Sequence, residues 1–301
     1  MSVLAITGGT GFVGSHLLDV AQAQGHAVRA LARRPQPPRP GVTWIEGALD
    51  RPDSLAALVA GAEAVIHVAG VVNAPDRAGF AAGNQGGTVA MVAATKAAGI
   101  ARFVQVSSLA AREPDLSDYG WSKAKADLAV IASGLDWTIV RPPGVFGPRD
   151  TETLPLFRAA AKGIVPLPPA GGRGSWIYAP DLAALLLALA TSDAAVCAVI
   201  EPDDAAPGGW DHRDFARAIG AAMGRRVLPL PLPRPLLSAA SWLGRRTGGT
   251  LAKLTADRVG YLAHPDWTSH APPPREVWHA TTPTPDALAA TAAWYRAQGL
   301  L

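Results

Sequence analysis

A glycine-rich turn near the N-terminus constrains the fold of this chain more than any other feature. The turn reads Thr7-Gly8-Gly9-Thr10-Gly11-Phe12-Val13-Gly14 and lies between an apolar run, 3–6, and an amphipathic segment, 13–24. In such a turn Gly8 permits the sharp reversal, Gly11 lets the backbone approach an anion, and Gly14 lets the helix pack closely on the strand. The first N–H groups of the helix then face the anion. The sequence therefore predicts a strand–turn–helix unit that holds a pyrophosphate.

Short apolar runs and alanine-rich segments alternate up to about residue 150. The apolar runs predict strands at 3–6, 27–32, 42–46, 64–68, 103–107 and 137–141, and the alanine-rich segments predict helices at 13–24, 54–59, 88–98 and 119–132. Asp53 or Ser54 is available to cap the second helix. Because the strands are apolar throughout, we expect them to be covered on both faces. This pattern predicts an α/β fold with a doubly wound parallel sheet.

The pattern changes after Pro148, where proline and glycine become dense and the alternation fades. A helix at 181–191 and a strand at 197–200 are both able to return to the main sheet. Further helices are predicted at 211–223, with Asp211 as its cap, and at 236–243 and 285–298. We therefore predict a dinucleotide-binding domain over 1–150, with 176–200 returning to it, and a smaller, mainly C-terminal substrate-binding region over 151–301.

Charge and composition exclude several classes of function. The net charge is only +3, and no basic run is interleaved with aromatic residues, which argues against nucleic-acid binding. Cys197 is the single cysteine, so no intrachain disulfide forms. The seven histidines lack the spacing of metal ligands. The chain enters a strand without a basic leader, and its apolar stretches are too short to span a bilayer. We expect a cytoplasmic protein without a metal.

The end of the second strand indicates which dinucleotide would bind. Binders of NAD usually carry an acid there, which accepts hydrogen bonds from the ribose. Here the strand ends in Arg33 and Arg34. Two guanidinium groups attract a 2′-phosphate, so the sequence favours NADP(H) over NAD(H). The alternative is that both arginines only solvate the loop before Pro35.

A second motif combines a phenol, an amine and a hydroxyl. Tyr119 and Lys123 are four positions apart, on one face of a predicted helix. Ser107 and Ser108 end the preceding strand, at the edge where a parallel sheet presents its ligands. A phenol with a pKa of about 10 is a weak acid–base catalyst at neutral pH, and a neighbouring ammonium lowers that pKa. The set suits hydride transfer to or from a ketone or alcohol carbon, with a serine holding the oxygen.

With these motifs the chain resembles the short-chain dehydrogenase/reductase superfamily, in its extended, epimerase/dehydratase-like branch. The resemblance covers nearly the whole chain and is most specific before residue 150. Besides the glycine turn and the Tyr–Lys pair, it rests on the segments Val-Ile-His-Val-Ala-Gly at 65–70, Asn-Gln-Gly-Gly-Thr at 84–88 and Arg-Pro-Pro-Gly-Val-Phe-Gly-Pro at 141–148. Alignment on the strand 103–106 puts Ser108, rather than Ser107, at the catalytic serine position.

The resemblance implies a role for each motif residue. Tyr119 would be the acid–base, Lys123 would lower its pKa and bind the ribose, Ser108 would orient the carbonyl, and Asn84 would support the site. His67 is expected to be a structural residue at a strand end. The residues that the resemblance places around the cofactor are Gly8, Thr10, Gly11, Phe12, Val13, Gly14, Arg33, Arg34, Ala48, Leu49, Val68, Ala69, Gly70, Tyr119, Lys123, Pro142, Gly144 and Val145.

The sequence departs from the family pattern near the adenine and at the site entrance. The segment 47–50 lacks the acid that usually follows Gly47, so adenine recognition falls to backbone groups or to Asp50. The stretch between Ser108 and Tyr119 is short, which should change the shape of the entrance.

Two further departures concern the substrate. Members that act on nucleotide sugars usually carry an arginine where this chain has Gly174, and an asparagine where it has Gly144. A diphosphate sugar would lose a cationic clamp and a polar contact. Arg173 is adjacent and remains an alternative clamp.

The C-terminal half offers apolar surface instead. The segment 228–243, followed by Arg245 and Arg246, is open to three interpretations: it lines a hydrophobic pocket, rests on a membrane surface, or is an ordinary core helix. The ending 291–300 resembles members related to 3β-hydroxysteroid dehydrogenases. That resemblance favours a hydrophobic substrate, such as a sterol or a ketone of sphingolipid synthesis.

Our leading hypothesis is an NADP(H)-dependent ketone reductase or alcohol dehydrogenase acting on a small hydrophobic molecule. The alternatives are a nucleotide-sugar epimerase or dehydratase, and a non-catalytic NADP-binding subunit or redox sensor. A homodimer is one assembly open to such a chain.

Overall fold

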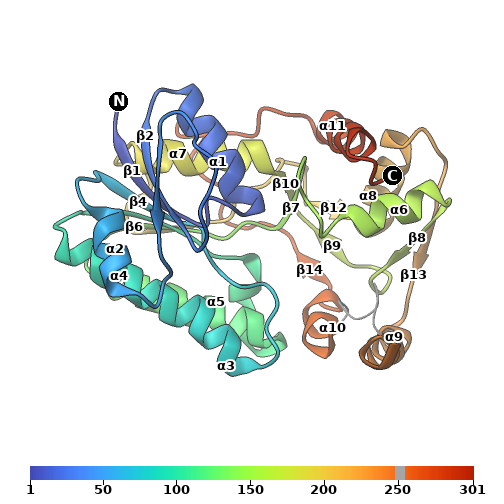
Figure 1. Ribbon diagram of the computed structural model, residues 1–301. Helices are drawn as coiled ribbons and strands as arrows, with labels where there is room; N and C mark the ends of the chain where they lie inside the picture. The colour runs from blue at the N-terminus through green and yellow to red at the C-terminus, as the bar shows by residue number, and fades with distance from the viewer. Residues whose placement is uncertain (248–254) are drawn as a thin grey trace. The chain divides into compact units, whose positions relative to one another are not determined.

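The apolar runs of the first half form one parallel sheet of seven strands, in the order β11-β6-β5-β4-β1-β2-β3 (Figure 1). The computed structural model describes residues 1–247 and 255–301. The strands are β1 (Val3–Thr7), β2 (Ala27–Ala32), β3 (Val42–Glu46), β4 (Ala64–His67), β5 (Arg102–Val106), β6 (Asp136–Val140) and β11 (Ala198–Ile200). The order reverses between β1 and β4, which is where sheets of this kind bind ligands. The predicted doubly wound α/β fold is confirmed.

Helices cover both faces of this sheet (Figure 1). On one face α1 (Phe12–Ala23) packs against α7 (Ala179–Ala190). On the other lie α2 (Pro52–Val59), α4 (Gly87–Ala97) and α5 (Asp118–Ile131). Leu55, Met91, Phe103 and Ile139 are among the buried side chains packed between this second layer and the sheet. Burial on both faces explains why the inner strands β1, β4, β5 and β6 are largely apolar, whereas the edge strand β3 is only partly buried.

The chain forms two compact units. Unit 1 contains the sheet and comprises Met1–Pro142, Ala179–Pro202 and Ala271–His279. Unit 2 comprises Pro143–Tyr178, Asp203–His270 and Ala280–Leu301. As expected, β11 returns to the main sheet, where it pairs with β6. Among the described residues, no helix is both long and apolar enough to cross a membrane.

Unit 2 is built from helices and very short strands around an aromatic core. Phe146, Phe157, Phe215 and Tyr295 are buried in that core. Asp211 caps α8 by accepting a hydrogen bond from the Arg213 N–H, as predicted. Its elements are β7 (Gly144–Phe146), α6 (Leu154–Ala161), β8 (Ile164–Leu167), β9 (Arg173–Gly174), β10 (Trp176–Tyr178), β12 (Trp210–Asp211), α8 (His212–Ala222), β13 (Leu228–Pro231), α9 (Arg234–Thr247), α10 (Ala256–Leu262), β14 (Asp266–Trp267) and α11 (Thr284–Ala297).

Two local expectations need correction. Neither Asp53 nor Ser54 caps α2, because the helix begins two residues earlier than predicted, at Pro52, with Arg51 at the cap position. The Ser54 hydroxyl instead lies within hydrogen-bond distance of the Arg51 carbonyl, at 2.8 Å, and of the Ala48 carbonyl, at 3.1 Å, and donates its one proton between them. The helix predicted from residue 88 is also preceded by α3 (Arg77–Phe80) and by a π-helical segment, η1 (Ala81–Gly86). These run directly into α4.

Arg102 connects three parts of unit 1. Its side chain is buried, with the residue 8% exposed, and it donates to the Leu189 carbonyl at the end of α7. It also donates to the Asp136 carbonyl and the Thr138 hydroxyl on β6. The guanidinium therefore satisfies acceptors that are wholly or partly buried.

We expect Arg102→Met to lower the free energy of unfolding by about 2–3 kcal/mol, because it leaves buried acceptors without a donor. Urea denaturation followed by circular dichroism measures the change. The exposed Arg51 serves as a matched control, since Arg51→Met should cost less than about 0.5 kcal/mol. Equal losses in both variants would contradict the proposed role of Arg102.

Candidate active site

The glycine turn is held by contacts that leave no room for side chains. Gly8 has φ +73°, and its carbonyl accepts a hydrogen bond from the Gly11 N–H at 2.9 Å. A Cβ on Gly14 would lie 2.0 Å from the Gly8 oxygen, and a Cβ on Gly8 would lie 2.7 Å from the Ala69 nitrogen. Helix α1 then begins at Phe12 without a side-chain cap. Its first N–H groups are therefore available to an anion, and the turn fits a pyrophosphate.

The turn lies directly against the segment that follows β4. The Thr7 hydroxyl accepts a hydrogen bond from the Ala69 N–H at 3.1 Å and shares another, at 2.7 Å, with His67 Nδ1. His67 ends β4 and is fully buried. Burial and the charge of Lys123 lower the pKa of His67 to about 3, so this imidazole is neutral. His67 thus fixes the strand end, as the sequence suggested.

Lys123 lies at the same edge of the sheet, next to the end of β5. It is 5% exposed, and its Nζ donates to the Val106 carbonyl at the end of β5, at 2.7 Å. The backbone of Gly70 passes beside the ammonium, since a Cβ there would lie 3.7 Å from Nζ. One loop thus contacts the glycine turn through Ala69 and passes beside the Lys123 ammonium at Gly70.

Asn84 ties that loop to α5. Its Oδ1 accepts from the Val71 N–H at 2.8 Å, and its Nδ2 donates to the Val71 carbonyl and to the Ser122 hydroxyl. A Cβ on Gly70 would lie 2.8 Å from this Oδ1. Asn84 lies within η1, so the π-helical turn brings its amide to the loop.

Tyr119 and Ser108 lie at the same end of the sheet. Tyr119 is in the first turn of α5, one turn before Lys123, and is half-buried with its ring 6.1 Å from that of Phe80. The Ser108 Oγ accepts from the Ala110 N–H at 3.2 Å, so its own proton remains available to another acceptor. Ser107 Oγ, by contrast, is buried and lies beside the Asp127 carboxylate.

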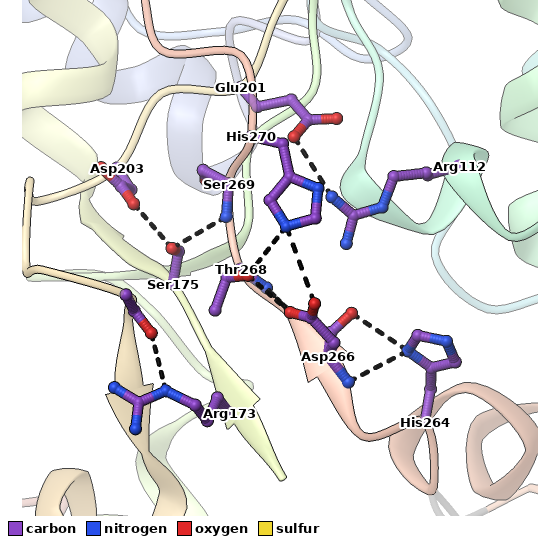
Figure 2. A network of polar contacts seen from close by, with 11 residues as sticks. Arg112, Arg173, Ser175, Glu201, Asp203, His264, Asp266, Thr268, Ser269 and His270 are labelled. Carbon is purple, nitrogen blue, oxygen red and sulfur yellow. Dashed lines mark hydrogen bonds and ion pairs between the residues drawn. The ribbon is translucent and has the colours of Figure 1, made fainter.

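The short stretch between Ser108 and Tyr119 folds as two 3₁₀ turns, Leu109–Arg112 and Pro114–Leu116. Arg112 anchors the first turn by pairing with the buried Glu201 at 3.3 Å (Figure 2). Ser117 then caps α5 by accepting a hydrogen bond from the Gly120 N–H. The stretch is therefore held within unit 1. It fixes where α5, the helix that carries Tyr119, begins.

A buried carboxylate, not singled out from the sequence, lies one turn beyond Lys123. Asp127 is 1% exposed, and its Oδ2 accepts from Arg141 Nε and Nη2, each at 3.0 Å. Burial raises the pKa of Asp127, and the Ser107 hydroxyl, Arg141 and Lys123 oppose that shift. Burial likewise lowers the pKa of Lys123 to about 8, and Asp127 opposes that shift. Its spacing of four from Lys123 was the signal that could have revealed it.

The remaining cofactor residues named from the sequence lie in two places. All of them belong to unit 1 except Gly144 and Val145, which open unit 2 in β7. Arg33 and Arg34 are exposed immediately after β2. Ala48 already uses its N–H and its carbonyl in hydrogen bonds with the Ser54 hydroxyl. Backbone recognition of an adenine at this loop would therefore fall to its neighbours.

Two positions of unit 2, Gly144 and Gly174, depart from the pattern of enzymes that bind a diphosphate sugar. Contacts within unit 2 bear on both. A Cβ on Gly144 would lie 2.5 Å from the Trp176 ring, which itself stacks on Phe215 at 4.0 Å. No side chain fits at Gly144. Arg173 donates from Nε to the Gly208 carbonyl at 2.7 Å and from Nη2 to the Gly209 carbonyl at 2.8 Å. Its guanidinium is already engaged with backbone, which weakens the alternative of a replacement clamp.

A doubly wound sheet with this glycine turn and a Ser–Tyr–Lys set defines a nucleotide-dependent oxidoreductase. A family model described as NAD(P)H-binding matches residues 8–163, more than half of the chain. The protein belongs to this family of NAD(P)-binding enzymes, within the extended short-chain dehydrogenases/reductases.

Two curated relatives illustrate the range of this family. The "Ceramide reductase" of Caulobacter vibrioides is 37% identical over 99% of this chain and 96% of its own length. A "3 beta-hydroxysteroid dehydrogenase/Delta 5-->4-isomerase" of Mycobacterium tuberculosis is 31% identical over 53% of this chain and 52% of its own.

Solved structures of low identity share the fold. The enzyme MoeE5 in complex with UDP-glucose and NAD has a TM-score of 0.75 at 21% identity, covering 99% of each chain. A human epimerase family protein with NADPH has a TM-score of 0.74 at 22% identity, covering 97% of this chain and 99% of its own.

We expect Asp127→Asn to lower the pKa of Lys123 below its value of about 8, because the amide removes a negative charge that favours the ammonium form. NMR titration of ¹³C-labelled lysine side chains measures this midpoint directly. Asp118→Asn removes a partly exposed carboxylate from the first turn of the same helix, where it pairs with Arg77 at 3.7 Å, and should leave the midpoint unchanged. An unchanged midpoint in Asp127→Asn would mean that Arg141 already cancels the field of the carboxylate.

Proposed function

We propose that this enzyme is an NADP(H)-dependent ketone reductase acting on a long-chain lipid of the ceramide class. The observation that carries the proposal is the position of the Lys123 ammonium. It is buried one turn from Tyr119 and beside the loop that also contacts the glycine turn. A bound dinucleotide would extend from the glycine turn toward this ammonium, so its reactive ring would come near the phenol.

Residues of this chain would provide the proton and orient the ketone. Bound NADPH supplies a hydride to the carbonyl carbon. Tyr119 gives its phenolic proton to the carbonyl oxygen, so the ketone gains a hydride and a proton and becomes a secondary alcohol. The Ser108 hydroxyl donates a hydrogen bond to the same oxygen and orients it. The charge of Lys123 stabilises the phenolate left on Tyr119, which lowers the barrier to proton transfer.

The charges after β2 support NADP(H) over NAD(H). Arg33 and Arg34 are exposed at the strand end, and no acid occupies that position. In the described part of the chain neither arginine has an ion-pair partner. A 2′-phosphate would therefore find two uncommitted guanidinium groups.

The ceramide class is supported by the full-length relative named for that activity. A nucleotide sugar is the alternative, since neighbours such as MoeE5 are bound to one. Two observations in unit 2 oppose it: Trp176 fills the space at Gly144, and Arg173 is engaged with carbonyls. The complete set of Ser108, Tyr119 and Lys123 opposes a third alternative, a non-catalytic subunit or redox sensor.

The proposal is tested by NADPH oxidation with a ketone analogue of ceramide, monitored at the nicotinamide absorbance. We expect turnover with this lipid, and neither turnover nor a thermal shift with UDP-sugars. Tyr119→Phe should lower kcat by about 10²–10⁴-fold while the Kd of NADPH stays within about twofold, because only proton transfer is lost. Near-normal turnover in Tyr119→Phe would refute the assigned chemistry. A response to UDP-sugars alone would favour the epimerase.

The cofactor preference is tested separately with Arg33→Gln/Arg34→Gln. We expect the Kd of NADPH to rise about 10–100-fold, because two charge-assisted contacts to the 2′-phosphate are lost. The Kd of NADH should change by less than about twofold, since its ribose lacks that phosphate. Fluorescence titration measures both, and Arg51→Gln controls for the general loss of a positive charge. Equal weakening of both cofactors would contradict the preference.

A further inference from the structure

Strands β8 and β13 of unit 2 expose an apolar face. They pair in parallel, with Leu228 opposite Ile164 and Leu230 opposite Pro166. Because strand side chains alternate, these four residues point to the same side of the small sheet. Ile164 is 49% exposed, Leu228 60% and Leu230 44%. We refer to Ile164, Pro166, Leu228 and Leu230 as the outer face.

The opposite side of the same sheet is already packed. Val165 and Leu167 alternate with the exposed residues of β8 and are buried in the aromatic core of unit 2. Helices α6 and α8 pack on β8, and α8 packs on β13. The outer face is therefore not needed to complete the core. Isolated exposed apolar residues are ordinary, but a contiguous group of them is typical of an interaction site.

Basic residues adjoin both strands of this face along the chain. Lys162 precedes β8, Arg225 and Arg226 precede β13, and Arg234 begins α9, which follows β13 directly (Figure 1). All four are exposed. Neither 153–180 nor 215–256, the stretches that contain these strands, includes a single Asp or Glu. Since the whole chain carries a net charge of only +3, positive charge is concentrated here. A partner that complements the outer face and its basic neighbours would present apolar groups beneath a layer of negative charge.

We propose that the outer face binds the surface of a bilayer that contains anionic phospholipids. The four apolar side chains would enter the interface, while Lys162, Arg225, Arg226 and Arg234 would meet lipid phosphates. A second copy of the chain fits less well, because a two-fold contact through this face would bring the same positive charges together. The proposal does not depend on the reaction that the enzyme catalyses. An enzyme bound to a bilayer in this way would, however, have access to a substrate that is a membrane lipid. Arg245 and residues 248–254 are not part of the proposed surface. The side chain of Arg245 and all of residues 248–254 lie outside the described residues.

Cosedimentation of the full chain with vesicles tests this proposal. One set of vesicles contains phosphatidylcholine alone, and the other contains phosphatidylcholine and phosphatidylglycerol in equal parts. At low salt we expect at least about tenfold stronger partitioning onto the anionic vesicles, and a marked decrease at high salt. Leu228→Glu/Leu230→Glu should weaken this partitioning by about tenfold or more, because it removes apolar contact and adds like charge to that of the lipid. Arg225→Gln/Arg226→Gln should instead reduce mainly the salt-sensitive part.

The matched control is Leu128→Glu/Ile131→Glu, which changes two comparably exposed apolar residues on α5 in unit 1. This control should bind vesicles as the wild type does. Circular dichroism and NADPH titration verify that each variant is folded, and gel filtration reports the oligomeric state. Failure of the wild type to bind anionic vesicles overturns the proposal. So does equal binding by the Leu228/Leu230 variant. If that variant only turns a dimer into a monomer, the face is a contact between copies and the proposal is also wrong.

Discussion

An ammonium group is kept almost entirely out of water at the edge of the main sheet, and the surrounding part of unit 1 is arranged to tolerate it. Burial disfavours the charged form of Lys123, so stabilising contacts have to come from the protein. The Val106 carbonyl accepts one of its three protons, and Asp127 supplies a nearby negative charge. The neighbouring His67 remains neutral, because burial, and then the charge of Lys123, lower its pKa to about 3. The remaining donors of Lys123 are then available to a ligand.

The same edge is shaped by steric limits on the backbone. Gly14 and Gly8 cannot carry a Cβ without colliding with backbone atoms, and Gly70 cannot carry one without colliding with Asn84. Gly8 and Gly14 belong to the glycine turn and Gly70 to the loop after β4, so the close approaches at these glycines connect α1, the turn, that loop and Lys123 in sequence. A substitution at any of them would separate the phosphate-binding turn from the ammonium. The conformational freedom of glycine at Gly8, with its positive φ, is only part of the reason for its presence.

The sequence was sufficient to predict the main sheet and much of its edge. Strands buried on both faces read as apolar runs, so their bounds were predicted within one or two residues. The π-helical segment that holds Asn84 had no such signal, because no side-chain period distinguishes it from the helix that follows. The strands of unit 2 have no comparable signal in the sequence, since β9 and β12 have two residues each and are separated along the chain by β10, α7 and β11. Gly144 was noticed as a departure, but its reason, the Trp176 ring, required the folded chain.

Unit 2 shows that the location of positive charge matters more than its amount. Its acid-free stretches contain several cations, and a count alone would suit a phosphorylated substrate as well as a membrane. The structure separates these interpretations by what each cation contacts. The Arg173 guanidinium donates hydrogen bonds to the carbonyls of Gly208 and Gly209 and so stabilises a loop. Lys162, Arg225 and Arg226 remain exposed around apolar side chains rather than around a cage of hydrogen-bond donors. A small diphosphate is bound by convergent donors, whereas dispersed cations around an apolar face match an extended surface of phosphates above hydrocarbon.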